Sequence, residues 1–357
     1  MLPTRNGFFL FHLFITDDVM ATCLNSRTIA FLNQKGGVGK TTTVVNLAAA
    51  IADAGRVVGV IDLDPQSHLS LHLGVEPGGG DDDFPTVYDV LIDPETAAQD
   101  AFCEARPNLF VMPAEVDLAA AEVELADSPD RHRRLAEKIG ACELAKEFDF
   151  LLIDCPPSLG LLTLNALALA REVFVPMQAH FLALQGLSRL LETVGMVSQK
   201  VNPTLQVSGI ILCMFEGNTR LASEVVGDLK EFFETQRATN TPWRRSRVLE
   251  PAIRRNIKLA ESPSFGQSIF DYDPSCPGAQ DYKQLATNLL AEWDAFTAMR
   301  EGNNSGAATA SGVIEVNDGV DRNEMVDDGD DHSAKGEVVV VPSAKTAAST
   351  SAAAAAS

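Results

Sequence analysis

Three glycines and two lysines lie close together near the amino end of the chain, in a pattern that suits phosphate binding. Lys35 begins this cluster, Gly36, Gly37 and Gly39 follow, and Lys40 ends it. Glycine lets the backbone approach an anion closely and point several N–H groups at it. The Lys40 ammonium is then expected to reach the β- and γ-phosphates of a nucleotide.

Hydroxyl and carboxylate groups elsewhere in the sequence predict a magnesium site. Thr41 follows the second lysine, and its hydroxyl is expected to hold Mg²⁺. Asp154 ends an apolar run and is expected to bind the same ion through water, although alone it could equally begin a turn. Mg²⁺ keeps several waters, so few protein ligands suffice. Asp62 and Asp64 leave another apolar run, where one can approach the metal and the other can orient the attacking water.

The flanking residues predict how these groups are positioned. Residues 28–33 have strand composition, residues 41–54 have helical spacing, and residues 57–64 form a continuous apolar run that ends in two acids. Such a run is typical of a parallel strand covered on both faces. Strand, helix and strand in succession form a βαβ unit. The glycine-rich turn is therefore expected at a helix N-terminus, whose partial positive charge favours an anion.

Strands alternate with helices through the rest of the chain, which indicates an α/β fold with a doubly wound, mostly parallel sheet flanked by helices. Further strands are predicted at residues 108–113, 148–157, 172–176, 205–213 and 246–251. Helices are predicted at residues 85–91, 116–126, 130–147, 159–170, 181–198, 221–233 and 278–296. One nucleotide-binding domain is expected over residues 28–300. Residues 1–27 are interpreted as an irregular N-terminal extension, with Met20 as an alternative start of translation.

Residues 301–357 differ in composition from the rest of the chain. They are rich in Ala, Ser, Gly and Asp, and they hold ten acidic and three basic residues, which is −7 of the formal charge of −21. Too little apolar surface is available to offset the entropy of ordering such a segment. We predict a disordered acidic tail.

Net negative charge ordinarily argues against nucleic acid as a partner, because DNA binding draws affinity from Lys and Arg at phosphates. A local cluster argues the other way, since residues 244–258 contain six cations and a single acid, Glu250. Such a cluster concentrates positive potential on one face. The alternative to a DNA-binding surface is that residues 244–258 form a solvated loop.

No apolar run approaches the length of a membrane span, so no stable membrane association is expected. The six cysteines are scattered, with no C-x-x-C pair, and are interpreted as buried thiols in a reducing cytosol. A cytoplasmic protein is predicted.

Four motifs in order resemble the chromosomal ParA/Soj branch of partition ATPases, which belong to the ParA/MinD class with a deviant Walker A motif. They are Asn33–Thr43, Asp62–Gln66, Leu152–Ser158 and Arg255–Gly266. The similarity spans about residues 28–292. Gln34 stands where the common P-loop pattern has its first glycine, and the second lysine, Lys35, is the deviant feature.

The resemblance implies an ATPase with ATP and Mg²⁺ as cofactors, whose hydrolysis is slow and partner-stimulated. Lys35 resembles the signature lysine that reaches across an ATP-sandwiched homodimer, and Asp64 the aspartate needed for hydrolysis but not for dimerisation. A second positive charge at the phosphates stabilises the charge of the transition state. The implied nucleotide-binding residues are Lys35, Gly36, Gly37, Val38, Gly39, Lys40, Thr41, Thr42 and Asn256, and the implied metal-site residues are Thr41, Asp62 and Asp154.

The family binds double-stranded DNA without sequence preference and works with a ParB/Spo0J-like centromere-binding protein. By resemblance, this chain is expected to associate with the nucleoid and to segregate chromosome or plasmid DNA. The residues assigned to DNA binding are Arg220, Arg254, Arg255 and Lys258. The family often has an arginine where this chain has Asn218, so Arg220 is considered as its replacement.

Other functions of the same class remain open alternatives. A MinD-like protein that positions cargo on a membrane or protein cluster should show a basic amphipathic helix at its C-terminus, and the acidic tail offers none. An iron–sulfur reductase would need cysteines placed to bridge a cluster, and Cys155 and Cys213 give no convincing pattern. Only the resemblance argues against an amide-forming synthetase.

Overall fold

The computed structural model describes residues 26–76 and 84–309, with the side chains of 181–185 and 300–309 left out. The chain divides into two units, Met1–Asn304 and Ser305–Ser357, of which the second is described only over its first few helical residues. The predicted N-terminal extension falls almost entirely outside the described residues. So does the predicted tail from residue 310 onward.

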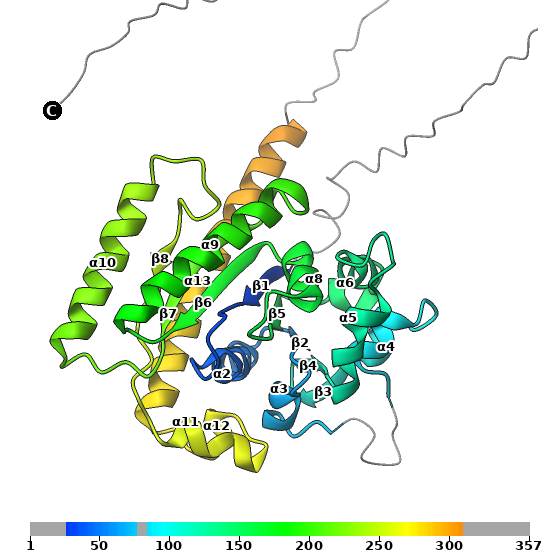
Figure 1. Cartoon of the computed structure of the whole chain (residues 1–357), viewed down its shortest axis with the longest axis horizontal. Helices are drawn as coiled ribbons and strands as arrows, with labels where there is room; N and C mark the ends of the chain where they lie inside the picture. Colours follow the sequence, from blue (N-terminus) through cyan, green and yellow to red (C-terminus); the bar gives the residue numbers. More distant parts are fainter. Residues whose placement is uncertain (1–25, 77–83, 310–357) are drawn as a thin grey trace, which may run out of the picture. The chain divides into compact units, whose positions relative to one another are not determined.

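A single eight-stranded sheet forms the centre of the first unit, in the order β3-β4-β2-β5-β1-β6-β7-β8. All neighbouring strands are parallel except the pair β3 and β4. The strands are β1 (Arg27–Phe31), β2 (Val58–Asp62), β3 (Cys103–Arg106), β4 (Leu109–Met112), β5 (Phe150–Asp154), β6 (Glu172–Met177), β7 (Gln206–Leu212) and β8 (Arg247–Val248). The phosphate-loop strand β1 lies between β5 and β6, near the middle of the sheet (Figure 1).

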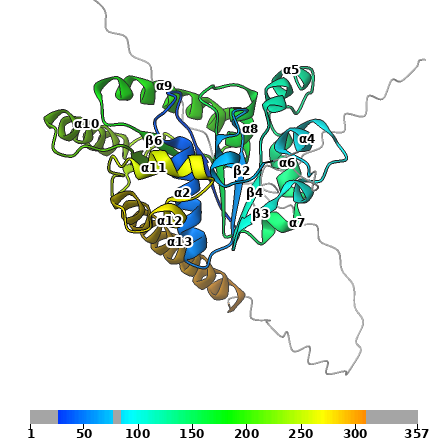
Figure 2. The same cartoon turned by 90° about the horizontal axis from the view of Figure 1, so that it is seen from below.

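Helices cover both faces of the sheet, with α8 and α9 on one side and α2 and α13 on the other (Figure 2). The α-helices are α2 (Lys40–Asp53), α3 (His68–His72), α4 (Val87–Ile92), α5 (Ala121–Glu124), α6 (Arg134–Gly140), α7 (Glu143–Lys146), α8 (Leu161–Leu169), α9 (Phe181–Lys200), α10 (Arg220–Gln236), α11 (Lys258–Glu261), α12 (Ile269–Tyr272) and α13 (Pro277–Thr309). The 3₁₀ helices are η1 (Ala98–Ala101), η2 (Val116–Ala120) and η3 (Ser262–Phe265).

The strands contribute to two cores because successive side chains of a strand point to opposite faces. In β1, Ile29 and Phe31 pack into the core beneath α2 and α13, and Ala30 packs into the core beneath α4, α6, α8 and α9. All five residues of β1, β2 and β5 are buried. This two-sided burial explains the continuous apolar runs of the sequence and confirms the doubly wound, mostly parallel sheet.

One edge of the sheet ends in a hairpin that the sequence did not predict. β3 returns to β4 through Pro107 and Asn108, and Asn108 adopts φ +63°, a left-handed conformation that asparagine tolerates. The pairing contains an irregularity between Glu104 and Arg106. β3 was missed because it is short, charged and only partly buried. β8, at the other edge, is two residues long.

The closing helix is longer than predicted. α13 continues to Thr309, so the helix crosses the boundary placed at residue 300, and the predicted tail does not begin at residue 301. Elongating an existing helix adds a hydrogen bond for each residue fixed, whereas starting one is costly. A segment too polar to begin a helix can therefore extend one.

Candidate nucleotide site

The glycine-rich segment forms the predicted turn between β1 and α2. Gly37 and Gly39 have φ of +70° and +95°, which L side chains rarely adopt, so backbone conformation requires glycine at both positions. Gly39 precedes the first residue of α2, and no side chain caps the N-terminus of the helix. The first N–H groups of α2 are therefore left for another acceptor, as in a phosphate site.

Thr41 and Asp154 meet at this N-terminus although they are far apart in the sequence. The Thr41 hydroxyl donates to Asp154 Oδ2 over 2.6 Å. The meeting follows from the sheet register, because Phe31, the last residue of β1, pairs with Asp154, the last residue of β5. Both elements thus end at the same carboxyl edge, where α/β sheets bind ligands.

The other oxygen of Asp154 supports the predicted metal site. Asp154 Oδ1 is buried and has no hydrogen-bond partner. A buried carboxylate oxygen without a partner is costly, and a hard cation is the ligand that carboxylate and hydroxyl oxygens prefer. The arrangement of Thr41 and Asp154 therefore fits Mg²⁺. The described residues hold no cluster of three or more His, Cys, Asp or Glu that could bind a metal.

Asp62 lies beside Asp154 at the ends of β2 and β5, which pair residue to residue. Asp62 Oδ2 accepts from the Ser70 hydroxyl over 2.8 Å and from the Ser70 N–H over 3.1 Å. Burial raises the pKa of Asp62 to about 6, against the effect of these bonds. Asp62 is held in place by α3, so it can shape the metal shell without binding substrate.

Burial first, and then the neighbouring Asp62 charge, raise the pKa of Asp154 to about 8, although Thr41 and Lys40 act in the opposite direction. The folded, metal-free chain therefore binds a proton here that the unfolded chain releases. The free energy of unfolding should fall as the pH rises from 3.8 to about 8, because the folded state then holds more protons than the unfolded state.

This linkage can be measured between about pH 7 and pH 8, where Asp154 is expected to lose its proton and the other shifted groups contribute little. Asp62 has a pKa of about 6, and burial lowers that of His72 to about 4 from 6.5. In EDTA, the free energy of unfolding by urea should fall by up to about 1.4 kcal/mol per pH unit. Asp154→Asn should remove this slope. An equal slope in the variant would contradict the assignment.

Asp64 and Lys40 occupy different environments. Asp64 lies two residues beyond β2, half-buried, and its Oδ1 accepts from the Gln66 N–H over 3.1 Å. Lys40 is 7% exposed at the start of α2 and close enough to lower the pKa of Asp154. Asp64 thus has access to water that Asp62 lacks. This difference favours Asp64 as the residue that orients water and Asp62 as the one near the metal.

Lys35 is exposed, and its side chain extends away from the glycine turn toward the β6–α9 connection. Its Nζ lies 2.6 Å from His180 Nε2, and its backbone N–H donates to Asn33 Oδ1 over 3.0 Å. Asn33 in turn donates to the carbonyl of Pro176 over 2.7 Å. The sequence indicated Lys35 but gave no sign of His180.

The other predicted nucleotide ligands lie on three elements. Gly36 and Val38 belong to the turn, where Val38 is buried, and Thr42 follows Thr41 in α2. Asn256 lies before α11, where its side-chain oxygen accepts from the Lys258 N–H over 2.8 Å. Its expected place near the adenine stays a prediction.

The four residues assigned to DNA binding are all paired with acids. Arg220 pairs with Glu224, Arg255 with Glu216 and Lys258 with Glu261, at 2.8, 3.1 and 2.8 Å. Exposed pairs of this kind are worth about 0–1 kcal/mol, so a phosphate can displace the acid. Arg255 lines a hollow of about 830 Å³ that also includes Asn218. Arg220 is outside that lining, at the start of α10.

Arg254 has a different role from its neighbours. Its guanidinium and its backbone N–H both bond to the Asp281 carboxylate, at 2.8 to 3.1 Å, and Asp281 is only 8% exposed. Removing the arginine would leave a buried carboxylate without its partner, which is strongly destabilising. Arg254 therefore ties the loop after β8 to α13, a role that its sequence neighbours did not suggest.

Two residues of the site were missed entirely from the sequence. Ser70 fixes Asp62 from eight positions away, and Tyr282 of α13 lies 3.0 Å from the Thr43 hydroxyl beneath the glycine turn. Neither belongs to a motif. Both contacts depend on how helices pack after the sheet has formed.

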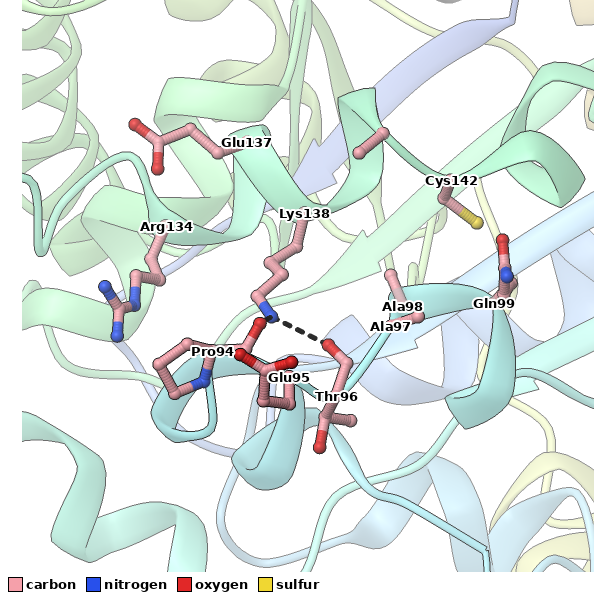
Figure 3. A pocket seen from close by; sticks show the side chains of 11 residues that line it. Pro94, Glu95, Thr96, Ala97, Ala98, Gln99, Arg134, Glu137, Lys138 and Cys142 are labelled. Carbon is pink, nitrogen blue, oxygen red and sulfur yellow. Dashed lines mark hydrogen bonds between the residues drawn. The ribbon is translucent and has the colours of Figure 1, made fainter.

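A separate hollow of about 370 Å³ lies between α6 and the loop that follows α4 (Figure 3). Arg134 and Lys138 are the cations that line it, and Lys138 donates to the carbonyl oxygens of Asp93, Pro94 and Thr96 over 2.7 to 3.0 Å. Lys138 thus holds the loop, and its three ammonium donors are used. We assign no ligand to this hollow.

The chain is similar to known proteins over most of its described length. A protein family described as an AAA domain matches residues 26–207. The chromosome-partitioning ATPase Soj of Treponema pallidum is 43% identical over 267 residues, which cover 74% of this chain and 97% of that protein. The sporulation initiation inhibitor protein Soj of Bacillus subtilis is 40% identical over 265 residues, covering 74% and 98%.

Solved structures share the fold. The cobyrinic acid a,c-diamide synthase of Mycobacterium smegmatis, with bound ADP and magnesium, superposes with a TM-score of 0.61 and 33% identity, covering 75% of this chain and 96% of that one. Identity to the partitioning ATPases is higher than to this synthase. No helix in the described ranges is long and apolar enough to cross a bilayer.

Proposed function

The chain belongs to the Soj/ParA family of chromosome-partitioning ATPases, and from this premise we propose that it is an ATP-dependent dimerising switch that binds DNA without sequence preference. The observation that carries the proposal is the exposed Lys35 beside a complete phosphate turn. The buried Lys40 is proposed to supply the charge for the nucleotide of its own subunit, which leaves the exposed Lys35 available for another contact. Lys35 suits a second nucleotide, held by a second copy of the chain.

Different residues of the site are assigned to phosphate binding, metal binding and orientation of the attacking water. The free N–H groups of α2 and Lys40 bind the phosphates, and Thr41 and Asp154 would hold Mg²⁺, which offsets phosphate charge when bound. Asp62, fixed by Ser70, shapes the metal shell. Asp64 orients the attacking water. Lys35 of each copy stabilises the phosphate charge of the other.

DNA binding is proposed to follow dimerisation, because two copies double the number of cations that face the phosphates. Affinity for DNA rises steeply with the number of phosphates neutralised. In a chain of formal charge −21, one copy alone should bind weakly. A ParB-like partner that stimulates hydrolysis would then return the chain to monomers and release the DNA. The cargo is proposed to be chromosome or plasmid DNA, with the protein associated with the nucleoid.

Binding to a random-sequence duplex should therefore occur with ATP and not with ADP or without nucleotide. The measurement is fluorescence anisotropy of the labelled duplex at one moderate salt concentration. Equal DNA affinity with ATP, with ADP and without nucleotide would contradict an ATP-dependent switch. Absence of binding in every state would favour the alternative, in which the ATPase positions a cargo on a membrane or a protein cluster.

The double variant Arg255→Ala, Lys258→Ala should weaken DNA binding uniformly across sequences. The slope of log affinity against log salt should become less steep by roughly 1 for each DNA phosphate that a copy no longer neutralises. Lys146→Ala is the matched control, because this lysine pairs with Glu143 on α7 and is assigned no phosphate. An unchanged slope would place the DNA surface elsewhere.

A further inference from the structure

The end of β6 and the connection from β6 to α9 contact residues 33–37 of the phosphate turn at three points. Asn33 donates to the carbonyl of Pro176, and Gln178 donates to the carbonyl of Gly37 over 3.4 Å. Between these contacts Lys35 meets His180. These two bonds from side-chain amides to backbone carbonyls position the segment that carries His180 against the turn that carries Lys35.

The Lys35–His180 contact requires one particular protonation state. An ammonium group can only donate, so His180 Nε2 must accept, and the imidazole must be neutral with its proton on Nδ1. A charged donor shortens and strengthens such a bond. The separation of 2.6 Å fits a charge-assisted bond. His180 is half-buried at the residue before α9, while Lys35 is exposed.

We propose that His180 is a positioning residue that holds Lys35 within its own subunit until a second ATP-loaded subunit arrives. This inference rests on the proposed function, in which Lys35 contacts the partner's nucleotide. The ammonium must then leave His180, so the bond within the subunit competes with the contact across the dimer. An interaction made only in the monomer lowers the affinity of dimerisation by its own strength.

The contact also couples Lys35 to the rest of the turn. Because Gln178 and Pro176 bond to the same turn, a shift of the glycine backbone toward a γ-phosphate disturbs the segment that bears His180. Nucleotide binding can in this way weaken the hold on Lys35. In a monomer without ATP, Lys35 stays bonded to His180 of the same subunit. Dimers without nucleotide are therefore disfavoured.

Removing the imidazole should therefore tighten ATP-dependent dimerisation. In full-length protein with a non-hydrolysable ATP analogue, His180→Ala should lower the dimer dissociation constant roughly two- to thirtyfold, because dimerisation breaks one exposed charged contact in each subunit and the two effects multiply. His180→Gln, which keeps a neutral acceptor, should restore values near wild type. ATP affinity of the monomer should be equal in all three, because Lys40 is untouched. Sedimentation velocity and calorimetry give the two quantities.

The outcomes separate this inference from the proposal beneath it. His132→Ala, which changes a half-exposed histidine before α6, is the matched control and should dimerise as wild type does. A His180→Ala protein that dimerises no better than wild type, or worse, would overturn the role of His180 while leaving the switch intact. Equal gains in His180→Ala and His180→Gln would overturn the role of the acceptor. A wild-type chain that stays monomeric with the analogue would overturn both.

Discussion

Replacing Lys40 with alanine is expected to weaken ATP binding severely. Lys40 is 7% exposed, so its ammonium meets the phosphates in a largely desolvated place. Truncating one partner of a buried charge pair costs about 2–5 kcal/mol, which raises the dissociation constant for ATP by at least roughly thirtyfold. Isothermal titration calorimetry measures the change directly.

A matched control separates this loss from a general effect of charge. Lys283→Ala removes an exposed lysine of α13 and should leave ATP affinity unchanged. Thermal melting in the absence of nucleotide checks that Lys40→Ala still folds, since an alanine beside Asp154 changes the local charge. A folded variant that kept wild-type ATP affinity would contradict the phosphate role of Lys40.

Asp64→Ala is expected to separate hydrolysis from dimerisation. Loss of a group that positions or activates a water typically slows a reaction 10²–10⁴-fold, and we expect at least about a hundredfold fall in ATP turnover. The phosphate turn, Thr41 and Asp154 remain, so ATP should still bind and the dimer should persist. Steady-state turnover and light scattering with ATP test the two halves.

Asp62→Ala is the informative contrast, because the two aspartates are only two residues apart. Asp62 is buried and bonded to Ser70, so its loss should lower thermal stability as well as activity. Asp228→Ala, an exposed change on α10, should alter neither. If Asp64→Ala turned over ATP at the wild-type rate, the attacking water would be oriented by another group. A variant that hydrolysed slowly but stayed monomeric with ATP would give Asp64 a role in assembly.

The sequence predicted the centre of the site because its groups occur where strands end. Thr41 and Asp154 are more than a hundred residues apart, yet the alternation of strands and helices was enough to place them at one edge of the sheet. In a parallel sheet the carboxyl ends of all strands lie at the same edge, whatever the lengths of the loops between them. The structure shows that Thr41 and Asp154 meet at this edge, while their role at a metal ion stays a prediction.

Contacts that depend on helix packing and loop course could not be predicted in the same way. Ser70 and His180 carry no motif, and α3 and the β6–α9 connection that position them have little periodicity of their own. Arg254 shows a further contact of this kind, since its basic neighbours suggested a DNA contact, which stays a prediction, and gave no sign of the carboxylate on α13 that binds it. A charge pattern in the sequence does not reveal partners supplied from another element.

The two edges of the sheet bear on how copies of this protein can meet. β8 offers only two residues for pairing, and β3 is antiparallel, irregular and charged. Edges of this kind resist the addition of a strand from another chain, which is the common start of aggregation. Copies of the folded chain can therefore lie close together without joining their sheets.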